Sequence, residues 1–107
     1  MDYRSEENEL IAMFKALSNP SRLQILQWLK APEEHFPKQV MADVQEVGVC
    51  VSFIQQKVGL SQSTVSLYLA ELQKAHLVIA TRQGQWTYYR RNEEAIQALA
   101  ESLKQNI

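Results

Sequence analysis

The stretch SFIQQKVGLSQSTVSLYLAELQKAHLVIATRQGQWTYYRR, residues 52–91, decides the fold of this 107-residue chain. Residues 52–58 predict a short apolar helix, and Gly59 ends it because glycine accepts the left-handed backbone of a helix C-terminus. Ser61 is a good N-cap for a second helix over residues 62–75. Two helices joined by so short a turn predict a helix-turn-helix unit.

A β-hairpin follows this unit directly. Leu77–Arg82 and Gln85–Arg91 alternate between apolar and polar residues, as half-buried strands do. Gln83-Gly84 lies between them and predicts a two-residue loop. A helix-turn-helix followed by a basic hairpin is the plan of a winged helix-turn-helix domain.

The flanking segments predict the remaining elements. Residues 5–17 have the periodicity of an amphipathic helix. Asn19-Pro20 supplies an N-cap and a first helical residue for a nearly apolar helix over 20–30. Val49-Cys50-Val51 is a short β-prone run, and 93–107 carries one apolar stripe. The predicted fold is therefore mainly α with a small β-hairpin wing, in the order helix, helix, strand, helix, helix, strand, strand, helix.

Two local features accompany this order. Ser52 and Gln55 form an S-x-x-Q capping box at the start of the third helix. Residues 31–48 contain Pro32 and Pro37, which prevent a long helix, so we expect at most a helical turn near Lys38–Val44.

Composition limits the class of protein. The chain is 46% hydrophobic and 21% charged, which suits one globular domain spanning residues 1–107. It contains no apolar run long enough to cross a bilayer, and its polar, acidic N-terminus lacks the features of a secretory signal. A single cysteine excludes an internal disulfide and fits a reducing cytoplasm. No nucleophile–base pair, phosphate loop or carboxylate cluster indicates an enzyme.

Charge is distributed unevenly along the chain. The net charge is −1, yet residues 72–92 contain four basic and no acidic side chains. These are Lys74, Arg82, Arg90 and Arg91. Phosphate neutralisation is local, so a basic hairpin supports binding to double-stranded DNA despite the overall acidity. The alternative is a hairpin with solvated basic edges.

Three segments resemble the ArsR/SmtB family of small bacterial transcriptional repressors: FKALSNPSRLQILQWLK (14–30), LSQSTVSLYLAELQKAHLV (60–78) and RQGQWTYYR (82–90). The first is similar to that family's second helix, the second to its recognition helix and the third to its wing. The resemblance implies a homodimeric repressor that binds a roughly palindromic operator and is released by a signal. It also implies that the terminal helices, 5–17 and 93–107, form the dimer interface; packing on their own domain is the alternative.

The residues expected to contact DNA lie on the helix predicted over residues 62–75 and on the wing. If Val65, Leu69 and Leu72 pack inward, a turn of 100° per residue places the opposite face outward. Glutamine and hydroxyl side chains can bond bases or phosphates, and an exposed leucine can contact a thymine methyl group. The predicted DNA-contacting residues are Gln62, Ser63, Thr64, Ser66, Leu67, Tyr68, Arg82 and Gln85. Trp86, Tyr88 and Tyr89 are expected to pack between wing and core instead.

The metal sites of the family have no full counterpart in this sequence. Its Cys-x-Cys pair at the start of the third helix corresponds here to Cys50-Val51-Ser52, and a serine hydroxyl is a poor ligand for a soft metal. The last helix contains no His, Asp or Cys. We therefore predict neither a metal site nor a cofactor.

Other signals and other functions stay open. Cys50 is a candidate redox switch, although a small buried apolar residue is the more common role of a lone cysteine. Residues 31–48 either cover a pocket for a small-molecule inducer, extend the dimer contact or pack locally. A winged helix that mediates protein–protein assembly is the alternative function.

His76 stands where the family usually has glycine at the end of the recognition helix.

Overall fold

The computed structural model describes residues 3–107, with side chains from residue 6 onward. It contains six helices and three strands within that range. In chain order they are α1 (Tyr3–Leu17), α2 (Pro20–Lys30), α3 (Pro32–His35), β1 (Val49–Cys50), α4 (Val51–Val58), α5 (Gln62–Lys74), β2 (Val78–Gln83), β3 (Trp86–Arg91) and α6 (Glu93–Asn106). The mainly helical class and the small hairpin are confirmed, and α3 is an additional helix that the sequence did not predict.

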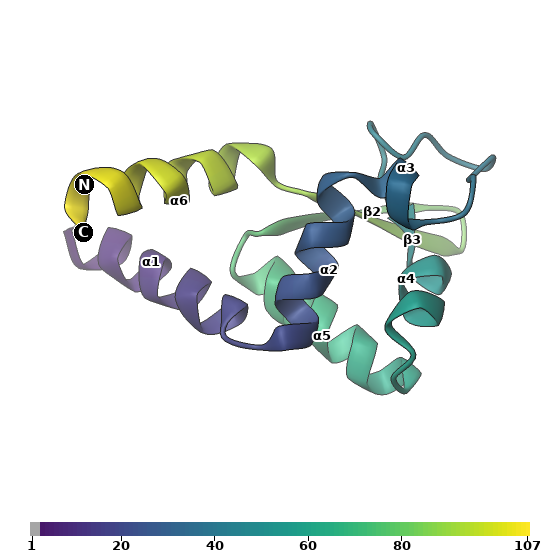
Figure 1. Cartoon of the computed structure of the whole chain (residues 1–107), viewed down its shortest axis with the longest axis horizontal. Helices are drawn as coiled ribbons and strands as arrows, with labels where there is room; N and C mark the ends of the chain where they lie inside the picture. Colours follow the sequence, from purple (N-terminus) through teal and green to yellow (C-terminus); the bar gives the residue numbers. More distant parts are fainter. Residues whose placement is uncertain (1–2) are drawn as a thin grey trace.

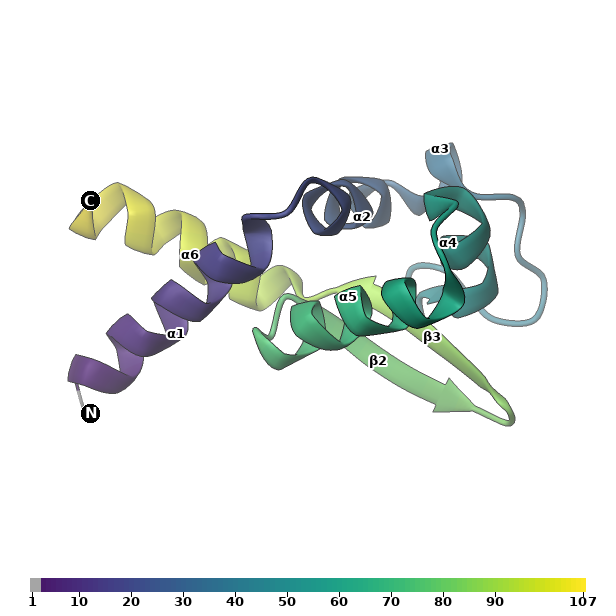
Figure 2. The ribbon, with the colours of Figure 1, turned by 90° about the horizontal axis from the view of Figure 1, so that it is seen from below.

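The strands form one antiparallel sheet in the order β1-β3-β2. Figure 1 shows α4 and α5 on one side of this sheet and the segment that follows α3 on the other. In Figures 1 and 2, α1 and α6 extend away from this body, and the start of α1 and the end of α6 lie at that extremity. None of the described helices combines the length and the apolarity that crossing a bilayer requires.

Helix α2 runs through the centre of the core, and its start follows the prediction. The Asn19 side chain accepts a hydrogen bond from the Arg22 amide at 3.0 Å, and Pro20 is the first helical residue. Only one face is fully buried, through Ile25, Leu26 and Leu29. Leu23 is exposed, so this nearly apolar helix is not buried on all sides.

The helical turn predicted near Lys38–Val44 is wrong in position: the local helix is α3 at residues 32–35, and a single turn lies later, where the Val47 amide donates to the Asp43 carbonyl at 2.9 Å. Pro32 starts α3, since its fixed φ suits a first helical turn. The Gln39 side chain also holds the segment that follows α3. The Gln39 amide donates to the Ala42 and Gly48 carbonyls at 2.9 and 2.8 Å, and its oxygen accepts from the Cys50 amide at 2.8 Å. These bonds tie the segment between α3 and β1, residues 36–48, to β1; this segment is called the insertion below.

The capping box predicted at Ser52 is also wrong. Helix α4 begins at Val51 with Cys50 as its N-cap, and no side chain caps it. Cys50 pairs with Tyr88 of β3 and is extended up to the first helical residue, so Ser52 is already inside the helix. Its hydroxyl oxygen lies 3.3 Å from the Cys50 sulfur instead. Gly59 ends α4 as predicted, with φ +74°.

The hairpin forms with a loop one residue later than predicted. Gln83 pairs with Trp86, so the two loop residues are Gly84 and Gln85 rather than Gln83 and Gly84. Gly84 has φ +61° at the first loop position, whereas Gln85 keeps a negative φ. That combination defines a type II′ turn, which favours glycine first and matches the twist of the strands.

The aromatic residues of β3 differ in burial. Tyr88 is fully buried, and Tyr89 is half-buried against the core, where desolvation raises the pKa of its phenol. Trp86 is 44% exposed at the outer end of the strand. The expected packing between wing and core is confirmed for the two tyrosines and wrong for Trp86.

Helix α5 ends in a Schellman motif centred on His76. The Leu77 amide donates to the Leu72 carbonyl at 3.0 Å, and the His76 amide donates to the Gln73 carbonyl at 2.9 Å. These bonds require a left-handed residue after the C-cap, and His76 has φ +63°. Leu72 and Leu77 are both fully buried, which adds the apolar contact typical of this motif.

Gly48→Ala is expected to destabilise the protein by at least about 3 kcal/mol, because alanine is strained there and collides with backbone. Gly48 has φ +118°, and an added Cβ would lie 2.5 Å from the Tyr89 carbonyl carbon and oxygen. Gly84→Ala is the matched control: its φ is also positive but the space is open, so a loss of only about 1 kcal/mol is expected. Urea unfolding measures both, and equal losses would contradict the account of the β1–β3 junction.

His76→Gly is expected to leave stability unchanged or raise the free energy of unfolding by up to about 1 kcal/mol. Glycine removes the strain of positive φ, while the two backbone bonds that end α5 remain. Thermal unfolding followed by circular dichroism measures the change. A clear fall in the melting temperature would show that the exposed histidine side chain makes a stabilising contact.

Candidate DNA-binding surface

The surface is built on α5, whose inward face is fixed by three side chains. Val65, Leu69 and Leu72 are each 0% exposed and belong to the main core cluster with residues of α2 and α4. This confirms the predicted inward face. Because the three positions share one side of the helix, its rotation about its own axis is fixed and the opposite side faces outward.

The outward side of α5 is mostly polar in its N-terminal half. Gln62, Ser63 and Ser66 are exposed there. Leu67 is 58% exposed among them, which is high for a leucine. Four of the predicted contact residues therefore share one accessible face at the start of a helix, where backbone amides also carry partial positive charge.

Thr64 and Tyr68, also predicted to contact DNA, are half-buried. The Ser61 hydroxyl accepts from the Thr64 amide at 3.2 Å, which confirms Ser61 as the N-cap, and donates to the Thr64 hydroxyl oxygen at 2.8 Å. The Thr64 amide and hydroxyl oxygen are therefore both bonded to the capping residue. The Tyr68 ring packs against the core and lies under the Arg22 guanidinium.

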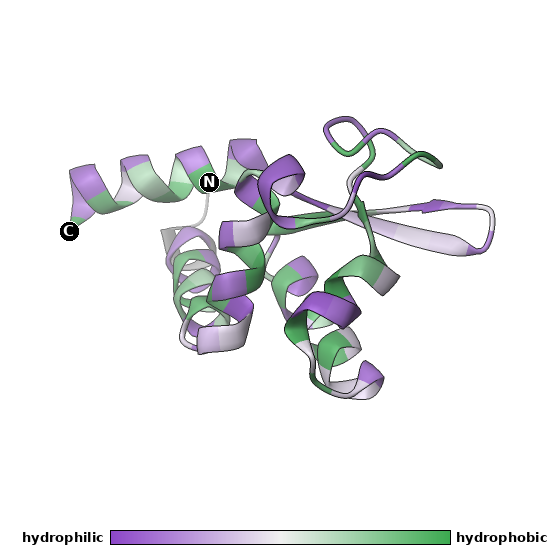
Figure 3. Cartoon of the chain, turned by 45° about the vertical axis from the view of Figure 1, so that its right-hand side comes forward, coloured by the Kyte–Doolittle hydropathy of each residue, from purple (hydrophilic) through white to green (hydrophobic). Residues whose placement is uncertain are grey.

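The wing is a second accessible part of this surface. β2 and β3 extend beyond the helices, and the outer part of the hairpin is coloured white to purple, that is, weakly to strongly hydrophilic (Figures 2 and 3). Arg82 and Gln85 are both exposed there. The Arg82 Nε donates to the Gly84 carbonyl at 3.3 Å, which leaves the rest of its guanidinium accessible.

The basic residues at the inner end of β3 have a different role. Arg91 donates twice to the Glu93 carboxylate, at 2.7 and 2.8 Å, and its side chain is 14% exposed. Arg90 has a buried Nε. Of the three arginines on the hairpin, Arg82 is exposed, whereas Arg90 and Arg91 are partly buried.

Cys50, the candidate redox residue, lies apart from this surface. The Cys50 thiol is 0% exposed. Among the residues that the structure describes, no three His, Cys, Asp or Glu side chains are gathered closely enough to hold a metal ion. Burial removes the solvent access that a reactive thiol requires, so this structure favours a packing role for Cys50.

Known proteins identify the family to which this arrangement belongs. No family model matches the sequence. The chain is 54% identical over 99 residues to the uncharacterised HTH-type transcriptional regulator YbzH of Bacillus subtilis, which covers 92% of this chain and 99% of YbzH. It is 33% identical over 94 residues to the nodulation protein NolR of Rhizobium meliloti, with coverage of 87% and 65%.

Solved structures agree with these relatives. One is the homodimeric winged helix-turn-helix DNA-binding domain of a possible ArsR-family regulator from Mycobacterium bovis, with a TM-score of 0.66, 27% identity and coverage of 96% of this chain and 83% of that one. NolR from Sinorhizobium fredii gives a TM-score of 0.59 at 30% identity, with coverage of 96% and 89%. This chain belongs to the ArsR family of winged helix-turn-helix transcriptional regulators.

An ArsR-family regulator is a DNA-binding protein and not an enzyme, in agreement with the sequence. The sequence also located α5, and it located the hairpin to within one residue of its loop. It missed the side chain of Arg22, which contacts both α1 and α5. The only signal for this residue was the Pro-x-Arg motif at the start of α2.

Ser61→Ala is expected to lower the free energy of unfolding by about 1 kcal/mol, because the first turn of α5 loses its side-chain acceptor. Ser61→Asn is the control, since asparagine caps helices equally well and should restore most of the loss. Urea unfolding of both variants gives the comparison. An Asn variant as unstable as the Ala variant would show that Ser61 contributes through its hydroxyl network and not through the cap.

Proposed function

We propose that this ArsR-family regulator is a homodimeric transcriptional repressor of the cytoplasm that binds a roughly palindromic operator. The observation that carries the proposal is the exposed polar face at the start of α5, next to a wing whose Arg82 is accessible. A helix with such a face enters the major groove, and a dimer places two of them about 34 Å apart, one helical turn of DNA.

The proposed base-contacting residues are Gln62, Ser63, Ser66 and Leu67. Glutamine can bond adenine through two atoms, the serines can bond bases or phosphates, and Leu67 can contact a thymine methyl group. Thr64 and Tyr68 flank this set from half-buried positions. On the wing, Arg82 and Gln85 are proposed to bond the backbone or the minor groove, which adds affinity without much sequence discrimination.

The proposed dimer interface lies on α1 and α6. Ile11 is 43% exposed on α1, and Leu103 and Ile107 are 41% and 80% exposed on and after α6. These apolar side chains lie on helices that extend away from the body of the domain (Figure 2), where a second copy can cover them. The solved Mycobacterium bovis domain is homodimeric, which supports a homodimer here.

We propose an unidentified small molecule, rather than a soft metal at the start of α4, as the releasing signal. The position beside Cys50 that would need a second thiolate holds the Ser52 hydroxyl, 3.3 Å from the sulfur, and oxygen binds soft metals poorly. Oxidation of Cys50 is the less favoured alternative, since its thiol is fully buried.

Gln62→Ala is expected to weaken binding to a duplex selected from a randomised pool by roughly 1–3 kcal/mol, with much less effect on a random duplex. Gln73→Ala is the matched control, because Gln73 is an exposed glutamine at the opposite end of the same helix. Fluorescence anisotropy with labelled duplexes measures both affinities. Equal behaviour of the two variants would remove Gln62 from the base-contacting set, and a wild-type protein without sequence preference would contradict the proposed function.

A further inference from the structure

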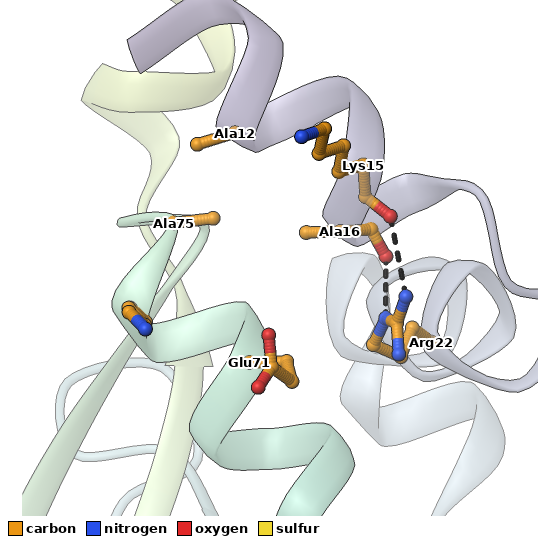
Figure 4. A pocket seen from close by; sticks show the side chains of 7 residues that line it. Ala12, Lys15, Ala16, Arg22, Glu71 and Ala75 are labelled. Atoms are coloured by element: carbon orange, nitrogen blue, oxygen red, sulfur yellow. Dashed lines mark hydrogen bonds between the residues drawn. The ribbon is translucent and has the colours of Figure 1, made fainter. Parts of the chain in front are cut away.

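Arg22 completes the C-terminal end of α1, although it belongs to α2. The last carbonyls of a helix lack intrahelical partners. The Arg22 Nε donates to the Ala16 carbonyl at 2.6 Å and its Nη2 donates to the Lys15 carbonyl at 3.2 Å. Figure 4 shows both bonds reaching from α2 to the end of α1. A cation at this end of a helix is also favoured by the helix dipole.

The same guanidinium group contacts α5. Its Cζ lies 5.6 Å from the centre of the Tyr68 ring, within the range of a cation–π interaction. The ring in turn packs against the core. One side chain therefore joins the end of α1 to the middle of the recognition helix.

Small side chains make the direct contact between α1 and α5. Ala16 and Ala75 are 5% and 6% exposed and both belong to the main core cluster. An open cavity of about 220 Å³, lined by Ala12, Ala16, Glu71 and Ala75, lies beside this contact (Figure 4). Alanine side chains interlock little, so Arg22 adds the directional bonds to the relative placement of the two helices at this point.

We propose that Arg22 is a positioning residue for DNA binding, which sets the orientation of α5 relative to α1 through its bonds to α1 and its contact with Tyr68. The inference rests on the proposed function, in which α1 contributes to the dimer and α5 contacts bases. In a dimer, the orientation of α5 relative to α1 determines the spacing of the two recognition helices. Specific binding requires that spacing, whereas binding to phosphates of random DNA tolerates its change.

The test compares Arg22→Lys and Tyr68→Leu, alone and combined, in the full-length protein. Lysine keeps the charge but cannot serve two carbonyls and stack on a ring at once, because it lacks the planar fork. Leucine removes the ring. Tyr68→Phe keeps the ring and loses only the hydroxyl, and Lys74→Gln removes a charge beside the same cavity. Anisotropy with selected and random duplexes, sedimentation velocity and thermal unfolding are measured for each.

Arg22→Lys and Tyr68→Leu should each lower affinity for the selected duplex about three- to tenfold, with little change for random DNA and an unchanged dimer. The combined variant should bind the selected duplex about as tightly as the single variant with the lower affinity, because both changes break the same contact. Tyr68→Phe should lose clearly less affinity than Tyr68→Leu, because the ring that faces Arg22 remains. Lys74→Gln should leave the ratio of specific to random affinity unchanged.

Three results would overturn the proposal. Arg22→Lys could bind the selected duplex normally, Tyr68→Phe could lose as much affinity as Tyr68→Leu, or the losses could add in the combined variant. The second result would make the Tyr68 hydroxyl a direct DNA contact. If Arg22→Lys does not fold, the comparison of Tyr68→Leu with Tyr68→Phe decides alone. A wild-type protein that binds no DNA would reject the proposed function itself, which separates the two failures.

Discussion

Burial of one face of α5 is the constraint on which the rest of the structure depends. Val65, Leu69 and Leu72 exclude solvent completely, so the helix cannot rotate without exposing apolar area worth roughly 25 cal/mol per Å². That fixed rotation leaves the opposite face polar and accessible. The Schellman motif at His76 then ends the helix and directs the chain into the hairpin, which places the wing beside the same face.

The insertion between α3 and β1 illustrates how a polar side chain can replace regular structure. Gln39 uses both of its amide atoms to bond the backbone of the insertion and of β1. Gly48 follows at a position where only glycine fits against the backbone of β3. Together they hold the short strand in place, and α4 starts directly from it. The position of the first helix of the helix-turn-helix therefore depends on a segment outside that motif.

Most of the fold could be predicted from local sequence signals. Helix caps at Asn19 and Ser61, the glycine at 59 and the periodicity of α5 act over a few residues, so the sequence shows them directly. The wrong or missing predictions concern residues whose structure depends on contacts with residues far away in the sequence. Pairing of Cys50 with β3 overrode the capping box at Ser52, and the bridging role of Arg22 depends on three helices meeting. The exposed candidate contact residues could be predicted from helix geometry. The bonds of Thr64 to Ser61 and the contact of Tyr68 with Arg22 could not.

The most direct test of the central claim is an NMR titration of isotope-labelled protein with a duplex selected from a randomised pool. The changes in amide chemical shift are expected to concentrate at residues 61–68, in the N-terminal half of α5, and at residues 82–86 in the wing. Amides of the insertion, residues 36–48, should change little, since that segment lies on the other side of the sheet (Figure 1). Changes confined to the insertion or to α6, with residues 61–68 unperturbed, would contradict the assignment of α5 as the recognition helix.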